Sequence, residues 1–227
     1  MATTERYRRP ADVPRRIPVF PLKGAILLPR ATLPLNVFEP RYLVMLDDVL
    51  AGERVLGIIQ PERTDGEEES PAGKSSPLKR VGCAGRVSAY QELDDGRLLI
   101  TLTGIARFDV LRQIEDDRPY RVCEVGWDSF AGDFAPDNSA AEVDRQALLK
   151  VVKSYLDSHR LRADWKSINE APTEFLVNSL SVISPFGSEE KQALLEARDL
   201  KARAAVLVAL AEMEIAAGDG GSGTTLQ

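Results

Sequence analysis

The sequence is poor in the residues that bind metals or form disulfide bonds. It has one histidine, His159, and two cysteines, Cys83 and Cys123, in 227 residues. Zinc sites made of four cysteines, of two cysteines and two histidines, or of three histidines are therefore excluded by count. A disulfide-rich secreted scaffold is excluded as well. We expect no metal site and no cofactor. We interpret both cysteines as free and buried, and they would form a redox pair only if their strands were neighbours.

Long apolar runs are also absent. No stretch approaches the roughly 18 consecutive apolar residues that a membrane helix needs. Residues 1–16 are polar and lack the apolar segment of a secretory signal. We therefore expect no membrane span and a cytoplasmic location. The net charge of −6 at pH 7 argues against binding to nucleic acid or to an anionic membrane, because both are themselves negatively charged.

Catalytic motifs are missing too. The run 73–75 (GKS) ends like a P-loop, but Glu68 stands where that motif needs glycine, and the run continues to Pro77 and not into a helix. His159 directly follows an aspartate and a serine, and adjacent helical residues point in different directions, so no triad forms. No spacing singles out a pair of carboxylates. The sequence predicts no catalytic residue, although an enzymatic or small-molecule site without a sequence motif stays an alternative.

Extended patterns fill residues 17–128. Prolines interrupt the apolar segments at the start of this region, which is typical of edge or bulged strands. Pro40 predicts the start of a helix that ends at Gly52. Asp95-Gly96 favours a type I′ hairpin turn, and Gly104 indicates a turn or a bulge. The strands expected after the helix cover residues 54–60, 81–93, 97–103, 107–114 and 120–127, with a solvated loop over 61–79.

Helical periodicity replaces the strand pattern after residue 128. Ser139 and Glu142 have the spacing of a capping box, and Pro172 predicts the start of a second helix. A third helix, capped by Ser188, is expected to run without interruption over 189–216. These patterns predict an α+β protein with a β-rich half followed by a helical half. Its expected parts are a flexible basic arm (1–16), a β-rich barrel (17–128), a helical subdomain (129–217) and a disordered tail (218–227).

Three groups of residues carry a resemblance to a known family. The first is IPVFPL at 17–22, LP at 28–29 and LPLNVFEPRY at 33–42. The second is VGCAG at 81–85, DG at 95–96 and LTGIARF at 102–108, with Ala84 one position earlier than the family pattern has it. The third is KQALLE at 191–196, followed by Arg203. In this order, the groups resemble the N-terminal substrate-binding domain of Lon proteases.

The resemblance implies both a fold and a function. The fold is a PUA-like pseudo-barrel followed by a helical bundle with a long last helix. In that family this region is implicated in recognising unfolded or tagged proteins, whereas the ATPase and the Ser-Lys protease domain lie beyond it. We therefore expect a stand-alone, non-catalytic binding module that acts as an adaptor or chaperone-like binder, with a AAA+ protease as a candidate partner. A peptidase label would come from family naming alone. RNA binding stays an alternative, because PUA-like folds elsewhere bind RNA.

The candidate binding residues lie at the junction of strand and helix. They are Phe38, Glu39, Arg41 and Tyr42, together with Arg107, which the resemblance places opposite them. A structural alternative has Glu39 capping the helix and pairing with Arg41 while the aromatic rings fill the core. The last helix is apolar on more than one side, which favours either deep burial or a homodimer through this helix.

Overall fold

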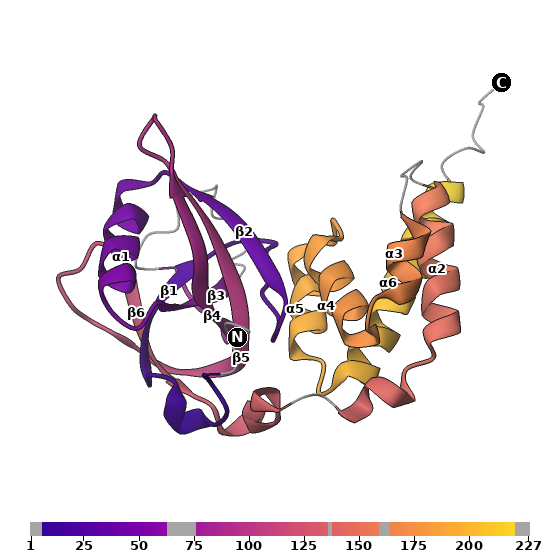
Figure 1. Cartoon of the computed structure of the whole chain (residues 1–227), viewed down its shortest axis with the longest axis horizontal. Helices are drawn as coiled ribbons and strands as arrows, with labels where there is room; N and C mark the ends of the chain where they lie inside the picture. Colours follow the sequence, from indigo (N-terminus) through magenta and orange to yellow (C-terminus); the bar gives the residue numbers. More distant parts are fainter. Residues whose placement is uncertain (1–5, 63–75, 136–137, 159–163, 221–227) are drawn as a thin grey trace.

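Two lobes lie side by side in the computed structural model, one built on strands and one built on helices (Figure 1). The structure describes residues 6–62, 76–135, 138–158 and 164–220. The β-lobe contains β1 (Arg16–Pro21), β2 (Thr32–Val37), α1 (Pro40–Ala51), β3 (Val55–Pro61), β4 (Leu78–Glu92), β5 (Leu98–Ile114) and β6 (Arg121–Gly126). The helical lobe contains α2 (Arg145–Ser158), α3 (Trp165–Glu170), α4 (Thr173–Ile183), α5 (Ser188–Glu196) and α6 (Leu200–Gly220).

The six strands form one sheet that closes on itself. Their order is β2-β5-β4-β3-β1-β6, and β5 also pairs with β6. Among the pairs formed by these six described strands, only β1 and β3 run parallel, and the others are antiparallel. The 17-residue β5 is long enough to pair with β2, β4 and β6 in turn. The expected barrel-like sheet and the α+β class are thereby confirmed.

A bulge at Gly104 joins two strands that were expected to be separate. The register between β4 and β5 shifts where Gly85 pairs with Gly104 and Ala84 pairs with Ala106. The amide of Gly104 donates to the carbonyl of Ala31 at 2.8 Å, and a Cβ at this position would collide with the carbonyl oxygen of Leu28. The bulge lets the strand bend and continue, so residues 98–114 form one element.

The β4–β5 hairpin has a different turn from the expected one. Gly96 has φ +79°, but Asp95 does not have a positive φ, and a type I′ turn needs both. The amide of Gly96 donates to the carbonyl of Leu93, and the amide of Leu93 donates to the carbonyl of Arg97, both at 2.9 Å. The loop therefore has three residues, with Gly96 in the left-handed position of a bulge.

The N-terminal segment packs against the barrel where the structure describes it. Tyr7 and Val13 are both 5% exposed and belong to an apolar cluster between the strands. Arg9 pairs with Asp12 at 3.2 Å, next to the short 3-10 helix η1 (Pro10–Asp12). The expectation of a flexible arm over 1–16 is therefore wrong for residues 6–16, because two apolar anchors outweigh the polar average of the segment. Residues 1–5 lie outside the described part.

The helical lobe begins differently from the expectation. The Ser139–Glu142 spacing falls within a short 3-10 segment, η3 (Asn138–Glu142), and caps no α-helix. Instead Asp144 accepts a hydrogen bond from the amide of Ala147 at 3.0 Å, just ahead of α2. The helix expected to start at Pro172 is present as α4, and α3 was not expected.

The long last helix is broken into two. α5 ends at Glu196, and α6 begins at Leu200 after an N-cap at Asp199, which accepts a hydrogen bond from the amide of Ala202 at 2.8 Å. α5 itself is preceded by Gly187 as its N-cap, one residue before the expected Ser188. The prediction of one continuous helix was wrong because the apolar stripe continues across the break. Among the helices that the structure describes, none has the length and apolar character needed to cross a membrane.

One apolar core runs through both lobes. It includes Phe20 and Leu28 of the β-lobe together with Val177, Leu194 and Leu207 of the helical lobe. A second cluster fills the other side of the barrel. The shared core makes the two lobes one packed body.

The two cysteines lie in strands that do not pair with each other. Cys83 is in β4 and Cys123 is in β6, and both are free and fully buried. Burial raises the pKa of both thiols, to about 11 for Cys123. The condition for a redox pair, neighbouring strands, is not met.

Candidate functional site

The β2–α1 corner, residues 37–42, presents one large apolar side chain to solvent. Val37 ends β2 as a buried residue, and the next side chain, Phe38, is 63% exposed. Pro40 then fixes the backbone at the first position of α1. A buried strand end on one side and a proline-started helix on the other hold this corner in one conformation.

A charged pair directly follows Phe38 in the chain. Arg41 donates to the Glu39 carboxylate from Nη2 at 2.6 Å and from Nε at 3.0 Å. Both side chains are partly exposed. The Glu39 side chain makes no cap hydrogen bond, and the helix start is served by its backbone carbonyl, which accepts from the amide of Tyr42. Glu39 therefore pairs with Arg41 but does not cap α1 with its side chain.

Tyr42 is a buried residue of the corner and packs against Phe20. It is 4% exposed, and its ring lies 4.0 Å from that of Phe20, centroid to centroid. The guanidinium of Arg41 lies over the same ring, 4.7 Å from its centroid. Burial raises the pKa of Tyr42. Tyr42 thus positions Arg41, and the exposed part of the corner consists of Phe38, Glu39 and Arg41.

Arg107 lies apart from this corner, in contact with the helical lobe. It is 3% exposed and binds both carboxylate oxygens of Asp133 at 2.8 Å. Its Nη1 also donates to the carbonyls of Leu195 at 3.1 Å and Ala197 at 2.5 Å, where α5 ends. Its guanidinium lies 4.5 Å from the ring of Phe130. The expectation that Arg107 faces the four corner residues is not met.

Two basic side chains from the third group of the resemblance also bind carbonyls at the ends of helices. Lys191 donates to the carbonyls of Ser181 and Val182 at 2.7 and 2.6 Å, at the end of α4. Arg203 donates to the carbonyl of Leu194 at 2.9 Å. Burial lowers the pKa of Lys191 to about 8. These residues satisfy carbonyls that helix ends leave without partners, so their contacts are structural.

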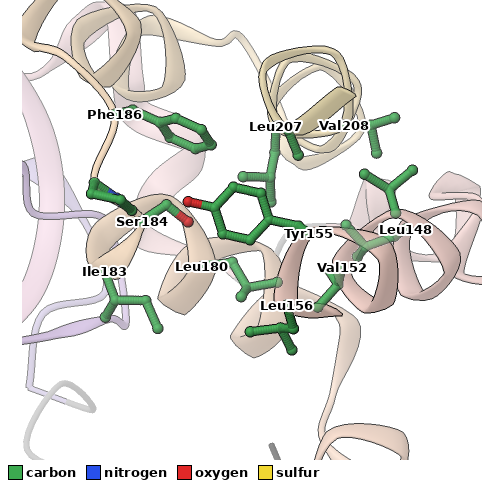
Figure 2. Close-up of a pocket in the computed structure, with 13 residues that line it drawn as sticks. Leu148, Val152, Tyr155, Leu156, Leu180, Ile183, Ser184, Phe186, Leu207 and Val208 are labelled. Carbon is green, nitrogen blue, oxygen red and sulfur yellow. The ribbon is translucent and has the colours of Figure 1, made fainter. Parts of the chain in front are cut away.

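An apolar cleft opens between α2, α4 and α6, and sequence reasoning did not find it (Figure 2). Tyr155 projects into the middle of it, with Phe186 beyond its ring at 6.4 Å between centroids. The cavity has a volume of about 210 Å³. Its lining residues are Leu148, Val151, Val152, Tyr155, Leu156, Leu180, Ile183, Ser184, Pro185, Phe186, Leu207, Val208 and Ala211. No charged side chain is among them.

The β2–α1 corner and the apolar cleft both offer surface for contact with another molecule. The described residues contain no group of three histidine, cysteine or acidic side chains placed to hold a metal ion. His159 and the GKS run at 73–75 lie outside the described residues. An exposed aromatic side chain beside a charged pair, and a separate apolar cleft, are arrangements that bind other molecules.

Comparison with known proteins gives a consistent family match. The family described as the ATP-dependent protease La (LON) substrate-binding domain matches residues 16–212. Lon protease 2 of Myxococcus xanthus is 26% identical over 202 residues, which cover 88% of this chain and 24% of that protein. Lon protease of Cytophaga hutchinsonii is 28% identical over 90% of this chain and 25% of that protein. The chain thus spans about a quarter of the length of these relatives.

Solved structures show the same fold. The crystal structure of a Lon N-terminal domain protein from Xanthomonas campestris is 25% identical, with a TM-score of 0.57 over 86% of this chain and 97% of that one. The N-terminal domain of Mycobacterium avium complex Lon protease is 15% identical, with a TM-score of 0.59 over 87% of this chain and 98% of that one. The second likeness concerns the fold alone. Both neighbours are matched along nearly their whole length.

Proposed function

The chain belongs to the LON substrate-binding domain family, and from this premise we propose that it is a non-catalytic module that binds unfolded or tagged polypeptide segments. The observation that carries the proposal is the exposed Phe38 on the β2–α1 corner. An isolated apolar side chain on a surface is ordinary. Phe38 differs because its backbone is fixed between a buried strand end and a helix start, and the Glu39–Arg41 ion pair follows it directly in the chain.

The corner offers the contacts that an extended polypeptide needs. A partner side chain packed on the Phe38 ring removes apolar surface from water. Arg41 and Glu39 offer donors and an acceptor to a neighbouring peptide backbone. Because Phe38 lies on a fixed backbone, little backbone conformational entropy is lost when a partner covers it. A small apolar contact with polar groups at its edge suits weak, sequence-tolerant binding.

We also propose a role in protein quality control. A module that captures unfolded segments and has no reaction of its own acts by presenting them, and a AAA+ protease is the partner that such a role requires. The family premise and the corner support this role, and a pull-down with purified components tests it. Retention of a AAA+ protease only in the presence of an unfolded client is the expected result.

The binding proposal is tested with reduced, carboxymethylated lactalbumin, a permanently unfolded protein. Phe38→Ser is compared with Leu111→Ser, because both side chains are 63% exposed and only the first lies on the corner. We expect Phe38→Ser to weaken binding about tenfold, which corresponds to the loss of roughly half of one aromatic contact. Leu111→Ser is expected to bind as the wild type does. The dissociation constants are measured by fluorescence anisotropy of the labelled client.

Thermal unfolding of each variant provides the control for folding. Both replaced side chains are exposed, so we expect midpoints within a few degrees of the wild type. Equal weakening by the two variants would assign the effect to general surface apolarity and contradict the corner. No binding of the unfolded client by the wild type would overturn the proposed function itself.

A further inference from the structure

We propose that the apolar cleft between α2, α4 and α6 is a second binding site, which takes one large apolar side chain of the Phe or Leu type from a bound polypeptide. This inference rests on the proposed function, because its ligand is part of a captured polypeptide segment. It adds a second site on the other lobe, built from residues that the corner does not share. The cleft is the pocket that Figure 2 shows around Tyr155.

The volume of the cleft sets the size of what it holds. Apolar cavities of about 150 Å³ lined by Leu, Ile and Phe stay dry and bind benzene. The cleft has about 210 Å³ and a similar lining, so it accommodates an aromatic ring or a branched aliphatic side chain with some room left. A second copy of this chain is a poor fit, because a stable interface buries about 800 Å² on each partner. The cleft is of the size that receives one anchor residue.

The lining excludes a charged group. An ion placed deep against these apolar side chains would lose most of its hydration, and two hydroxyls would be its main replacement, so burial of a charge is unfavourable. The side-chain oxygens drawn in Figure 2 are the hydroxyls of Tyr155 and Ser184, which lie near the end of α4. The group that enters the cleft is therefore uncharged and apolar over most of its surface.

The rim of the cleft points to a polypeptide as the source of that group. Ile183 lines the cleft and is 73% exposed, and Pro185 beside it is also exposed. A free hydrocarbon of cavity size would leave this apolar rim in water. A peptide carrying the anchor side chain would cover the rim with the residues on either side of the anchor, and that burial adds to its affinity.

Charge near the cleft favours basic neighbours in the bound segment. Burial is the larger cause that raises the pKa of Tyr155 to about 12, and the Glu214 carboxylate is the second. This carboxylate therefore lies close to the Tyr155 hydroxyl. No lysine or arginine lines the cleft. A peptide with Lys residues beside its apolar anchor would therefore bind better than the same peptide with Asp residues there.

The test uses a labelled Gly/Ser/Lys peptide with a central Phe-Leu pair. Two comparison peptides carry Ser-Ser in place of the pair, or Asp in place of Lys. We expect the wild type to bind the first peptide about thirtyfold more tightly than the Ser-Ser peptide, because one apolar side chain is removed from water. The Asp peptide is expected to bind less tightly than the Lys peptide. Anisotropy gives all three dissociation constants.

Two variants and a matched control locate the site. Ala211→Leu fills the cleft from α6, whereas Ala209→Leu adds the same atoms at an exposed position of the same helix. We expect Ala211→Leu to abolish the preference for Phe-Leu and Ala209→Leu to keep it. Ile183→Ser changes only the exposed rim and is expected to weaken binding severalfold. If Ala211→Leu fails to fold, the binding of Ile183→Ser alone tests the cleft.

Failure of this inference is distinguishable from failure of the proposed function. If the wild type, Ala211→Leu and Ile183→Ser bind the Phe-Leu peptide equally, the cleft is not a binding site. The proposal for the β2–α1 corner is not affected by that result. If Ala209→Leu and Ala211→Leu weaken binding alike, the cleft is likewise overturned. If the wild type binds neither this peptide nor unfolded lactalbumin, both proposals fall together.

Discussion

Arg107 illustrates how a single side chain can join two lobes. It comes from β5, in the barrel, yet its partners are Asp133 after the barrel and the backbone carbonyls of Leu195 and Ala197 at the end of α5. Its five donors in a fixed planar arrangement suit several acceptors at once. Because Arg107 and Asp133 are both nearly buried, neither charge has water as an alternative partner.

We predict that Arg107→Met lowers the free energy of unfolding by about 3–5 kcal/mol, because it removes the guanidinium from the buried Asp133 charge and from the α5 carbonyls and leaves Asp133 only the backbone amide of residue 107. Arg112→Met is the matched control: Arg112 lies in the same strand, pairs with Glu124 and has a side chain that is 62% exposed. We expect that change to stay below about 1 kcal/mol. Urea unfolding followed by circular dichroism measures both. Similar losses in the two variants would contradict the structural role of Arg107.

At the scale of elements, the two largest departures from the expected layout are a strand that continues and a helix that stops. β5 continues through Gly104 because a residue without Cβ lets the strand lie against the backbone at Leu28. The last helix stops after Glu196 because Asp199 caps a new helix and Arg107 binds the carbonyls at the end of the old one. In both places a local signal works together with a distant partner.

We predict that Gly104→Ala is strongly destabilising, by about 3 kcal/mol or more, because the new Cβ meets the carbonyl of Leu28 and neither backbone can yield easily. Gly132→Ala is the control, since a Cβ there would have no neighbour within 4 Å. It should change the free energy of unfolding by less than about 1 kcal/mol. Denaturant midpoints compare the two variants. A tolerated Gly104→Ala would show that the close approach to Leu28 is not required.

At the scale of the whole molecule, polar and apolar contacts both bind the lobes together. Asn178 of α4 donates to the carbonyl of Pro29 at 3.1 Å and accepts from Arg203 at 3.0 Å. Gln60 of β3 donates to Gln192 of α5 at 3.0 Å. The core cluster runs beneath these bonds through both lobes. The two candidate binding surfaces are therefore parts of one rigid body, each on a different lobe.

We predict that the lobes unfold together. The chain has two tryptophans, Trp127 after the barrel strands and Trp165 in α3, so each lobe carries its own fluorescent reporter. Trp165→Phe and Trp127→Phe each leave a single tryptophan. In each variant the normalised fluorescence transition should coincide with the normalised circular dichroism transition, because the lobes share a core. A fluorescence transition that separates from the circular dichroism in either variant would contradict a single cooperative unit.

Local chemistry in the sequence was enough to determine the class of the fold and the place of several elements. Three signals depend only on neighbours in the chain: the switch from strand to helix periodicity after residue 128, Pro40 at the start of α1, and Pro172 ahead of α4. The resemblance carried by these segments led to the family that the comparisons show. The exposure of Phe38 did not follow from the sequence, because an aromatic side chain at a strand end suits a core or a surface equally.

Tertiary structure alone decided the contacts between distant segments. The partners of Arg107 lie 26 or more residues away, and the cleft needs α2, α4 and α6 to converge. Helical spacing shows which residues share a face, but not whether a neighbouring helix covers that face completely. Packing determines where a gap is left, and so the cleft became visible only in the folded chain. The break between α5 and α6 became visible there too, because Arg107 from the barrel binds the carbonyls at the end of α5.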